Sequence, residues 1–399
     1  MMKNRTGIWI VGAWGGVATT VTVGWLATMK KVVPAWGLTT ELPEFSGYEM
    51  PDWSDFHFGG CEVRASSLAQ SAEELVEQKA LDAEIFQAVA SSLPSLDAEI
   101  VPGILSRSGK VVEEMADWAN DGGQTAREKV AAMQDAMRAF VKRNQLEHLI
   151  VVNLMSTEPA SPLNSEQEAW TCWEALDQTL DSPECPLPAS SLYAVAALQL
   201  GYDYINFTPS LGATPPALED LAVANHARMM GNDGKTGETL MKSVLAPLFA
   251  HRHLQVMSWV GHNIFGNRDG VVLDDPRNKA TKVASKSHLL TQILGYAPQT
   301  LVSIEYIQSL GDWKTAWDHI HFRGFLGTPM TLQFTWQGCD SLLAAPLVLD
   351  MIRLTEWARR RQFIGKMDFL ACFFKSPIRV EEQGFVRQFE MLEAWIHAK

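Results

Sequence analysis

Hydrophobic and polar residues follow one pattern up to about residue 240 and a different pattern beyond it. In the first part, short apolar runs at 148–154 (HLIVVNL) and 202–207 (YDYINF) are separated by longer segments with helical periodicity, at 71–93 and 123–145. Short buried strands that alternate with amphipathic helices are typical of a doubly wound α/β domain with a parallel sheet. We therefore predict that fold class for the N-terminal part.

Beyond residue 240 the chain is rich in β-branched and aromatic residues. Segments with this composition are 254–266, 300–310, 319–325 and 330–338, and helical periodicity returns at 341–361. This pattern predicts an inserted sheet region followed by a helix that leads back to the first domain.

The N-terminus combines charge and hydrophobicity in a way that has two interpretations. Lys3 and Arg5 precede the apolar run 7–29, which could be a signal peptide or a membrane span. Glycines and threonines dilute the run, so a strand, a glycine turn and a buried helix explain it better. The turn-rich, aromatic segment 43–60 is expected to be a surface loop.

The glycine turn in VGAWGGVATT lies between the first predicted strand and the first predicted helix. Such a turn can place a pyrophosphate at the helix N-terminus, and it contains Gly12, Gly15, Gly16, Val17 and Ala18. The spacing differs from GxGxxG, and tight packing of strand on helix is the alternative. An acidic residue that ends a later strand should then bind the adenosine ribose, and Glu62 in GGCEVR is the candidate.

Composition and charge narrow the class of ligand. The chain has 399 residues, 47% of them hydrophobic, and a formal net charge of −13, which argues against a nucleic-acid partner. The five cysteines form no CxxC pair, which favours a reducing compartment. The HRH and HIH histidines lack an acidic partner at metal-ligand spacing, so we expect no metal site.

The stretch MMGNDGKTGET at 229–239 contains Gly-Lys-Thr, the end of a P-loop pattern. Met229 stands where that pattern needs a glycine, so the match is partial. An ordinary solvated turn and a site for an oxyanion both remain open for this segment.

Lysines and aspartates recur in turns beside glycine or proline. Lys282 and Lys286 are four residues apart, so on a helix they would share one face and could hold an anion between them. The alternative is that these lysines are only solvent-exposed and that these aspartates hydrogen-bond within their own turns. The other members of this set are Lys235, Lys314, Lys375, Asp233, Asp269 and Asp340.

Seven segments, in this order, resemble the inositol-3-phosphate synthase family, also called myo-inositol-1-phosphate synthase. The resemblance runs from about residue 7 to 377 and is carried by SSLYAVAALQLGYDYINFTPS, GNDGKTGETLMKSVL, HNIFGNRDG, KVASKS, GDWK, CDSLLAAPLVLD and FFKSP. It implies a Rossmann-like NAD-binding domain made of 1–239 and 344–399, with an inserted catalytic and oligomerisation domain at 240–343. It also implies a cytoplasmic homotetramer of inositol and phospholipid biosynthesis, with no membrane partner.

The same resemblance implies a redox-neutral conversion of D-glucose 6-phosphate to 1D-myo-inositol 3-phosphate. In the family, NAD⁺ oxidises C5, C6 loses a proton, the enolate attacks the C1 aldehyde, and NADH reduces C5 again. Every intermediate is an anion, which is why lysines suit this chemistry.

The resemblance also assigns roles to individual residues. The phosphate turn matches Thr236, Gly237, Glu238 and Thr239, with Lys286 reaching the same phosphate. Lys282 and Lys375 match lysines at the C5 oxygen, and Lys314 matches a lysine at the C1 carbonyl. The family also has polar residues that orient these lysines or bridge to the nicotinamide, and these correspond to Asn263, Asp233, Asp269 and Asp340. The cofactor-binding set is Gly12, Gly15, Gly16, Val17, Ala18, Glu62, Ser156, Thr157, Asp233 and Asp340.

Several positions depart from the family pattern. They are the glycine turn itself, Glu62 for an aspartate, Arg268 for an asparagine, Phe207 for a glycine, and Glu238 for a glutamine. A carboxylate at 238 should repel a phosphate unless it is turned away, protonated or paired with Lys235, Lys242 or Lys286. A cyclase that makes another cyclitol phosphate, an NAD-dependent sugar-phosphate dehydrogenase and an inactive NAD-binding scaffold stay as alternatives. The scaffold is disfavoured by the intact lysine set, Lys282, Lys286, Lys314 and Lys375.

Overall fold

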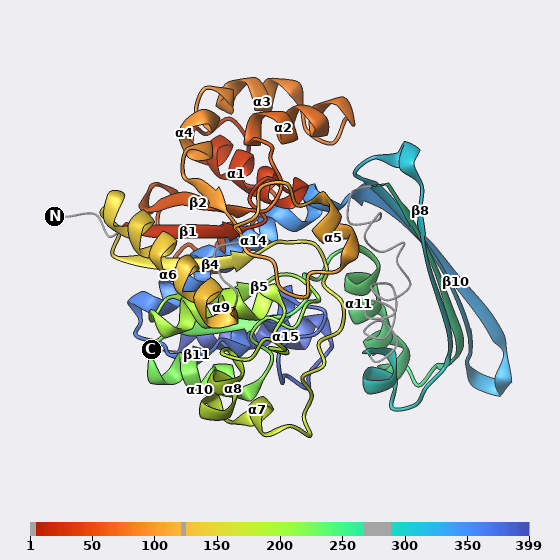
Figure 1. Ribbon diagram of the computed structural model, residues 1–399. Helices are drawn as coiled ribbons and strands as arrows, with labels where there is room; N and C mark the ends of the chain where they lie inside the picture. The colour runs from red at the N-terminus through yellow and green to blue at the C-terminus, as the bar shows by residue number, and fades with distance from the viewer. Residues whose placement is uncertain (1–4, 121–124, 267–288, 399) are drawn as a thin grey trace.

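The computed structural model describes residues 5–120, 125–266 and 289–398, and it contains two separate sheets (Figure 1). The first sheet has seven strands in the order β11-β6-β5-β4-β1-β2-β3, and all of its neighbours are parallel. Its strands are β1 (Thr6–Val11), β2 (Phe56–Glu62), β3 (Ile100–Pro102), β4 (His148–Asn153), β5 (Asp203–Asn206), β6 (Arg228–Gly231) and β11 (Gly365–Lys366). The strand order reverses between β1 and β4, where ligands bind in open α/β sheets, at the carboxyl ends of the strands.

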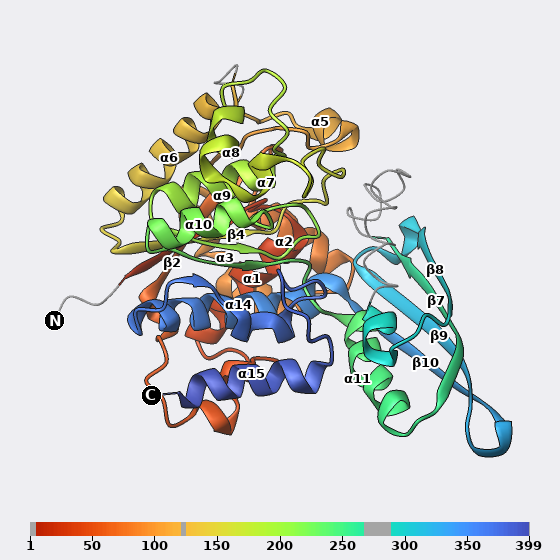
Figure 2. The same cartoon turned by 90° about the horizontal axis from the view of Figure 1, so that it is seen from below.

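Helices cover both faces of this sheet (Figure 2). One face carries α1 (Gly16–Met29), α14 (Asp340–Arg360) and α15 (Phe385–His397), and the other carries α6 (Ala126–Arg143), α9 (Ala189–Gln199) and α10 (Pro216–Ala224). Helices α2 (Leu68–Glu77) and α3 (Ala83–Ala90) pack on α1. Shorter helices are α4 (Leu93–Asp97), α5 (Lys110–Met115), α7 (Glu168–Thr171) and α8 (Trp173–Thr179), and 3-10 turns lie at Thr39–Glu41, Pro43–Phe45, Trp53–Asp55, Gln308–Leu310, Phe325–Gly327 and Asp368–Phe373.

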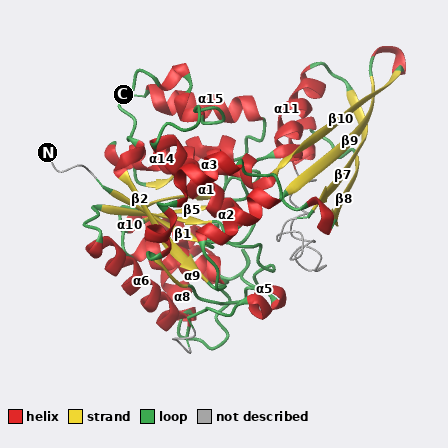
Figure 3. Cartoon of the chain, turned by 90° about the horizontal axis from the view of Figure 1, so that it is seen from above, coloured by secondary structure: helices red, strands yellow, loops and turns green. Residues whose placement is uncertain are grey.

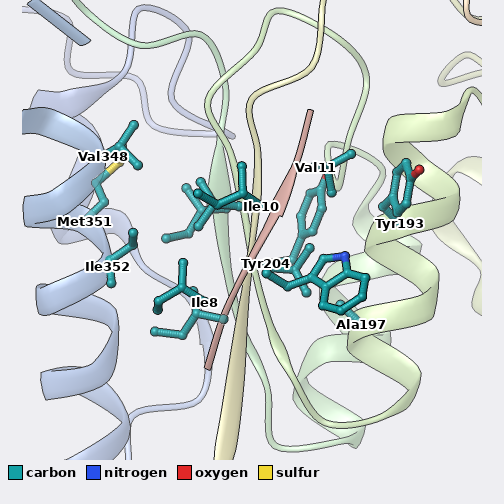
Figure 4. Close-up of a cluster of buried hydrophobic side chains, with 14 of the residues drawn as sticks. Ile8, Ile10, Val11, Tyr193, Ala197, Tyr204, Val348, Met351 and Ile352 are labelled. Carbon is teal, nitrogen blue, oxygen red and sulfur yellow. The ribbon is translucent and has the colours of Figure 1, made fainter. Parts of the chain in front are cut away.

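Alternation along β1 builds the core on both faces of the sheet (Figure 4). Ile8 and Ile10 point toward α14, whereas Val11 points toward the side of α9 that carries Tyr193. All four side chains are almost completely buried. Successive side chains of a strand point to opposite faces, so one apolar run fills two helix–sheet layers.

The helical segments largely follow the sequence pattern. The segment predicted at 123–145 forms α6, which Thr125 and Glu128 begin with a reciprocal capping box. The segment predicted at 71–93 divides into α2 and α3, because the Asp82 carboxylate accepts hydrogen bonds from the N–H groups of Glu84 and Ile85 and starts a second helix.

The expectation of a surface loop at 43–60 is wrong for its last part, which is strand β2 beside β1. Two glycines make this position a tight fit. A Cβ on Gly60 would lie 2.1 Å from the carbonyl oxygen of Ile10, and one on Gly59 would lie 2.5 Å from the ring of Phe140. Because glycines stand where apolar side chains would otherwise mark a buried strand, the apolar pattern of this strand is not visible in the sequence.

The second sheet projects to one side of the first domain (Figures 1 and 3). Its order is β10-β9-β7-β8, built from β7 (Gln255–Phe265), β8 (Gln299–Tyr306), β9 (Trp313–Arg323) and β10 (Pro329–Cys339). Within this second sheet, β7 and β8 pair in parallel, whereas the other neighbouring strands are antiparallel. Helix α11 (Gly237–His251) covers its inner face, where Phe249, Trp259 and Ile320 are buried together. The predicted α/β fold with an added sheet region is confirmed.

The apolar run at the N-terminus forms β1, the glycine turn and α1, as predicted. Across the described parts of the chain, no helix has the length and hydrophobicity needed to cross a membrane.

Candidate active site

A cavity of about 340 Å³ lies at the carboxyl ends of the parallel strands and reaches the edge of the second sheet. Its walls come from the ends of β1 and β2, from the loops after β4, β5 and β6, and from the segments around Asp312, Asp340 and Lys375. These segments are far apart in sequence, and the reversal of strand order brings them together.

The glycine turn forms the floor of this cavity. Gly12 has a φ of +82°, and a Cβ there would lie 3.0 Å from the Cα of Met155, so this position needs glycine. Gly15 is the N-cap of α1 without a side-chain cap, and a Cβ on Gly16 would meet its nearest atom only at 3.8 Å. The first N–H groups of α1 are therefore available to an anion. Val17 also lines the cavity, whereas Ala18 is fully buried beneath the turn.

Glu62 ends β2 and lines the same cavity, as expected for a residue that binds a ribose. Its Oε2 accepts a hydrogen bond from the backbone N–H of Trp14 at 3.1 Å, and its Oε1 accepts one from Val63 at 2.9 Å. The two bonds fix the carboxylate, which is 7% exposed, beside the glycine turn. Each oxygen keeps a further lone pair that can accept a hydroxyl proton.

Asp233 and Lys375 form an ion pair on the cavity wall. The Nζ of Lys375 lies 2.9 Å from Oδ1 of Asp233, and the N–H of Lys375 donates to the carbonyl of Asp233 at 2.6 Å. Within the part of the chain that is described, the buried Oδ2 of Asp233 has no hydrogen-bond partner. A buried oxygen of this kind suits a ligand that donates a hydrogen bond.

Lys314 and Asp340 form a second pair that lines the cavity, with Nζ 3.4 Å from Oδ2. Asp340 is the first residue of α14, and its N–H donates to the carbonyl of Asp312. Asp312 also accepts hydrogen bonds from the N–H and the hydroxyl of Ser341. Asp312 was not predicted as a site residue, although it lines the cavity and stands two residues before Lys314 in the GDWK motif.

The predicted phosphate turn leads into α11. Thr236 lines the cavity and is the N-cap of α11 without a side-chain cap, and Gly237 has a φ of +55° with open space where a Cβ would be. Thr239 and Asn263 are buried behind this turn. The helix begins with N–H groups that no side chain caps, which is the geometry for binding a phosphate dianion.

Glu238 points away from the cavity into the space between α11 and β7. Its Oε1 accepts from Nζ of Lys242 at 2.5 Å, and its Oε2 accepts from Nδ2 of Asn263 at 2.6 Å. Of the three partners considered from the sequence, Lys242 is therefore a partner in the structure, whereas Lys286 lies outside the described residues. The side chain of Lys235 also turns inward, and its Nζ donates to Gln388 on α15.

Of the remaining predicted residues, some line the cavity and others lie outside the described part of the chain. Ser156 and Thr157 line the cavity in the loop after β4. Lys282, Lys286 and Asp269 lie outside the described residues, as does the departure at Arg268. The departure at Phe207 lines the cavity, and its ring lies 1.9 Å from the point where a Cβ on Gly234 would be. The aromatic ring thus occupies the space that the glycine leaves.

A family profile and two relatives indicate the same family for this chain. A family profile described as myo-inositol-1-phosphate synthase, and named for NAD binding, matches residues 6–397. Inositol-3-phosphate synthase 1 of Bacteroides thetaiotaomicron is 30% identical over 94% of this chain and 90% of that protein. Inositol-3-phosphate synthase of Brassica napus is 29% identical over 90% of this chain and 76% of that protein.

Two solved structures have the same fold. The inositol-3-phosphate synthase of Caenorhabditis elegans superposes with a TM-score of 0.88 at 23% identity, over 99% of this chain and 85% of that one. A myo-inositol-1-phosphate synthase-related protein of Thermotoga maritima superposes with a TM-score of 0.80 at 24% identity, over 99% of each chain. At such identities these two likenesses show the fold alone.

Proposed function

This chain belongs to the myo-inositol-1-phosphate synthase family, and on that premise we propose that it converts D-glucose 6-phosphate to 1D-myo-inositol 3-phosphate with NAD. One observation supports the proposal most directly. A dinucleotide-type glycine turn, an uncapped helix N-terminus and two lysine–aspartate pairs all converge on one cavity. That combination provides for a cofactor, a phosphate and an anionic intermediate in one place.

The chain's own residues fit NAD. The first N–H groups of α1 would take the pyrophosphate, and Glu62 would accept a ribose hydroxyl. Ser156, Thr157, Asp233 and Asp340 also line the cavity and complete the proposed cofactor set. When bound, NAD supplies a hydride acceptor and later a hydride donor, so the overall reaction has no net redox change.

The N-terminus of α11 is the proposed phosphate site. The backbone N–H groups of Gly237, Glu238 and Thr239 would bind the phosphate, with help from the hydroxyl of Thr236. The carboxylate of Glu238 does not oppose this role, because it is turned inward and neutralised by Lys242. Lys286 stays a prediction for the same phosphate.

The two lysines of the cavity are proposed to act on sugar oxygens. Lys375 would hold the proton that the C5 oxygen loses and regains, and Asp233 keeps its Nζ in place. Lys314 would place a positive charge at the C1 oxygen, where an alkoxide develops during cyclisation. Asp340 orients Lys314, and Asn263 orients the Glu238 side chain. Lys282 and Asp269 keep the roles assigned from the resemblance.

The decisive experiment is to incubate the protein with glucose 6-phosphate and a catalytic amount of NAD⁺ and to identify the product by phosphorus and proton NMR. We expect an inositol phosphate and no net growth of the reduced-nicotinamide absorbance. A different cyclitol phosphate would support a related cyclase. Stoichiometric NADH would support a sugar-phosphate dehydrogenase.

We also propose that the chain is a homo-oligomer, a tetramer by resemblance, that associates through the outer face of the second sheet. Strand alternation directs uncharged side chains outward from β7 and β9, including Val260, His262, Thr315, Trp317 and His319. In a chain of net charge −13, the uncharged centre of this face on β7 and β9 would let two copies approach with little repulsion, and Glu305 of β8, which stands opposite Ile264, is an acidic residue at its edge. We further propose that 1–239 with 344–399 form the NAD-binding domain and that 240–343 form the catalytic and oligomerisation domain. The proposal is supported by the second sheet, whose strands β7 to β10 all lie within 240–343.

A cytoplasmic location is proposed from the cysteines. All five are free thiols, and burial raises the pKa of Cys61 and of Cys372 to about 12. Thiols held protonated in this way are inert packing groups, which suits a reducing compartment.

A further inference from the structure

Glu158 is a buried carboxylate one residue beyond the cavity wall, and no role has been given to it so far. It follows Ser156 and Thr157 and is 1% exposed. Its Oε1 accepts a hydrogen bond from the N–H of Ser190 at 2.9 Å, and its Oε2 accepts one from the Ser190 hydroxyl at 2.5 Å. Ser190 lies in the first turn of α9, so the carboxylate caps that helix.

The same residue also holds the loop after β5. The N–H of Glu158 donates to the hydroxyl of Ser210 at 3.0 Å, and the N–H of Ser210 donates to the hydroxyl of Thr208 at 3.2 Å. Thr208 lines the cavity. Glu158 thereby connects the loop after β4 to the loop after β5.

Helix α9 extends the connection to a third wall. Its Tyr193 lines the cavity, and the Tyr193 hydroxyl accepts a hydrogen bond from the N–H of Ile104, a further lining residue. The hydroxyl of Ser190 also accepts from the N–H of Gly212 at 3.1 Å. One carboxylate therefore sets the relative position of three segments that surround the proposed cofactor.

We propose that Glu158 is a positioning residue for NAD and that its ionised form maintains the shape of the cofactor cavity. The inference rests on the proposed function only in that NAD binds in this cavity. Ionised, the carboxylate accepts both hydrogen bonds from Ser190. Protonated, it carries a donor of its own in place of one acceptor site, and the Ser190 hydroxyl, which already accepts from Gly212, must reorient.

The ionisation of Glu158 falls in an accessible pH range. Burial raises the pKa of Glu158 to about 7, against the opposing effect of the hydrogen bonds from Ser190 and Ser210. Among the described residues, the titratable group that faces it is Tyr204 of β5, whose hydroxyl donates to the carbonyl of Ser190. Because burial also raises the pKa of Tyr204 well above its usual value, that group stays neutral and adds no second titration.

The test measures the dissociation constant of NAD⁺ by isothermal titration calorimetry at pH 6, 7 and 8, without substrate. For the unmodified protein we expect binding about fivefold weaker at pH 6 than at pH 8, which is about 1 kcal/mol. Glu158→Gln should bind NAD⁺ weakly at every pH, because it is neutral throughout. Glu158→Asp should keep the pH dependence, because it can still ionise.

Asp350 provides a matched control. It is a buried carboxylate in α14 that accepts three hydrogen bonds from Thr39 and Thr40, and burial raises its pKa to about 6. Asp350→Asn should leave the pH dependence of NAD⁺ binding unchanged. The inference is overturned if the unmodified protein binds NAD⁺ equally at pH 6 and pH 8, or if Glu158→Gln keeps its pH dependence. Normal NAD⁺ binding without product would instead count against the proposed reaction alone, and no NAD⁺ binding at any pH would overturn both.

Discussion

The ammonium of Lys242 lies 2.5 Å from Oε1 of Glu238, one turn earlier on α11, and both side chains are buried at the junction of α11 and β7. Pairing with Lys242 neutralises the carboxylate of Glu238 in the first turn of α11. Without that pairing, the negative charge would repel a phosphate at the N-terminus of the helix. The pairing also makes each partner dependent on the other, because a single buried charge is costly.

Glu238→Gln is therefore expected to affect stability far more than substrate affinity. The change leaves the Lys242 ammonium buried without its counter-charge, which should lower the free energy of unfolding by ~3 kcal/mol. The KM for glucose 6-phosphate should change by less than about tenfold, or 1.4 kcal/mol. Urea denaturation and steady-state kinetics measure the two effects.

The double variant Glu238→Gln/Lys242→Met is the control, since it removes both charges and should regain most of the lost stability. A fall in KM much larger than tenfold in the single variant would mean that the carboxylate opposes this phosphate. The natural substrate would then carry a different group there.

Substituting either cavity lysine is expected to lower turnover beyond any loss of stability that comes from leaving Asp233 or Asp340 without its counter-charge. Lys375→Met and Lys314→Met should each lower kcat on the order of 10²–10⁴-fold, because in the proposed mechanism their ammonium groups act on charge that develops during the reaction. Binding of NAD⁺ should change little in either variant. Lys110→Met is the control, because Lys110 lies in a surface pair with 82% of its side chain exposed. Near-normal kcat in a cavity variant would remove that lysine from the mechanism.

Glu62 should set the preference for NAD over NADP. Its carboxylate is fixed beside the glycine turn, where a 2′-phosphate would meet a negative charge. Glu62→Gln removes the charge and leaves Arg64 on the same wall, so the ratio of the NADP⁺ and NAD⁺ dissociation constants should fall at least about tenfold. Glu74→Gln, another cavity carboxylate, is the control, and an equal change there would mean a general effect of cavity charge.

The buried amine of Lys235 should make the free energy of unfolding depend on pH. Burial lowers its pKa from 10.5 to about 8, and it is 2% exposed with its Nζ donating to Gln388. Between pH 8 and 10.5 the unfolded chain keeps this proton and the folded protein loses it, so this group makes stability rise with pH in that range. The charged form costs on the order of 3 kcal/mol at pH 7.

Lys235→Met should remove that dependence. Relative to the unmodified protein, its free energy of unfolding should be highest at pH 7, and the difference should decrease by about 3 kcal/mol by pH 10.5. Lys235→Arg, which stays charged, should be destabilised over the whole range. Parallel stability curves for Lys235→Met and the unmodified protein would contradict the assignment. Urea denaturation at pH 7, 9 and 10 measures the difference.

The sequence was sufficient for the elements that rest on periodicity. Strands β4 and β5, helix α6 and the second sheet follow directly from the spacing of apolar residues. Strand β2 was hidden, because Gly59 and Gly60 replace the apolar side chains that would have marked it. The capping aspartate Asp82 was equally hidden inside a continuous helical pattern.

Side-chain directions at the site could not be predicted from the sequence. The spacing of four between Glu238 and Lys242 was a signal for their pairing, but Lys235 was an equal candidate. What directs Lys235 inward is pairing of its turn with residues 373–378, more than a hundred positions away. Asp312 was missed for a similar reason, because its partner Ser341 lies 29 residues later, in the first turn of α14.

Trp317 should be central to the proposed association through the outer face of the second sheet. Trp317 stacks on His262 there, with ring centroids 5.8 Å apart, and 37% of Trp317 is exposed. A charge in the core of an interface is costly because it loses water without gaining a partner. If the proposed oligomer forms through this face, Trp317→Asp should therefore convert it to smaller species in light scattering after size exclusion. Trp36→Asp is the control, since Trp36 is 89% exposed on a loop of the first domain and should leave the assembly unchanged. If Trp317→Asp kept the full mass while Trp36→Asp reduced it, the contact between copies would lie on the first domain.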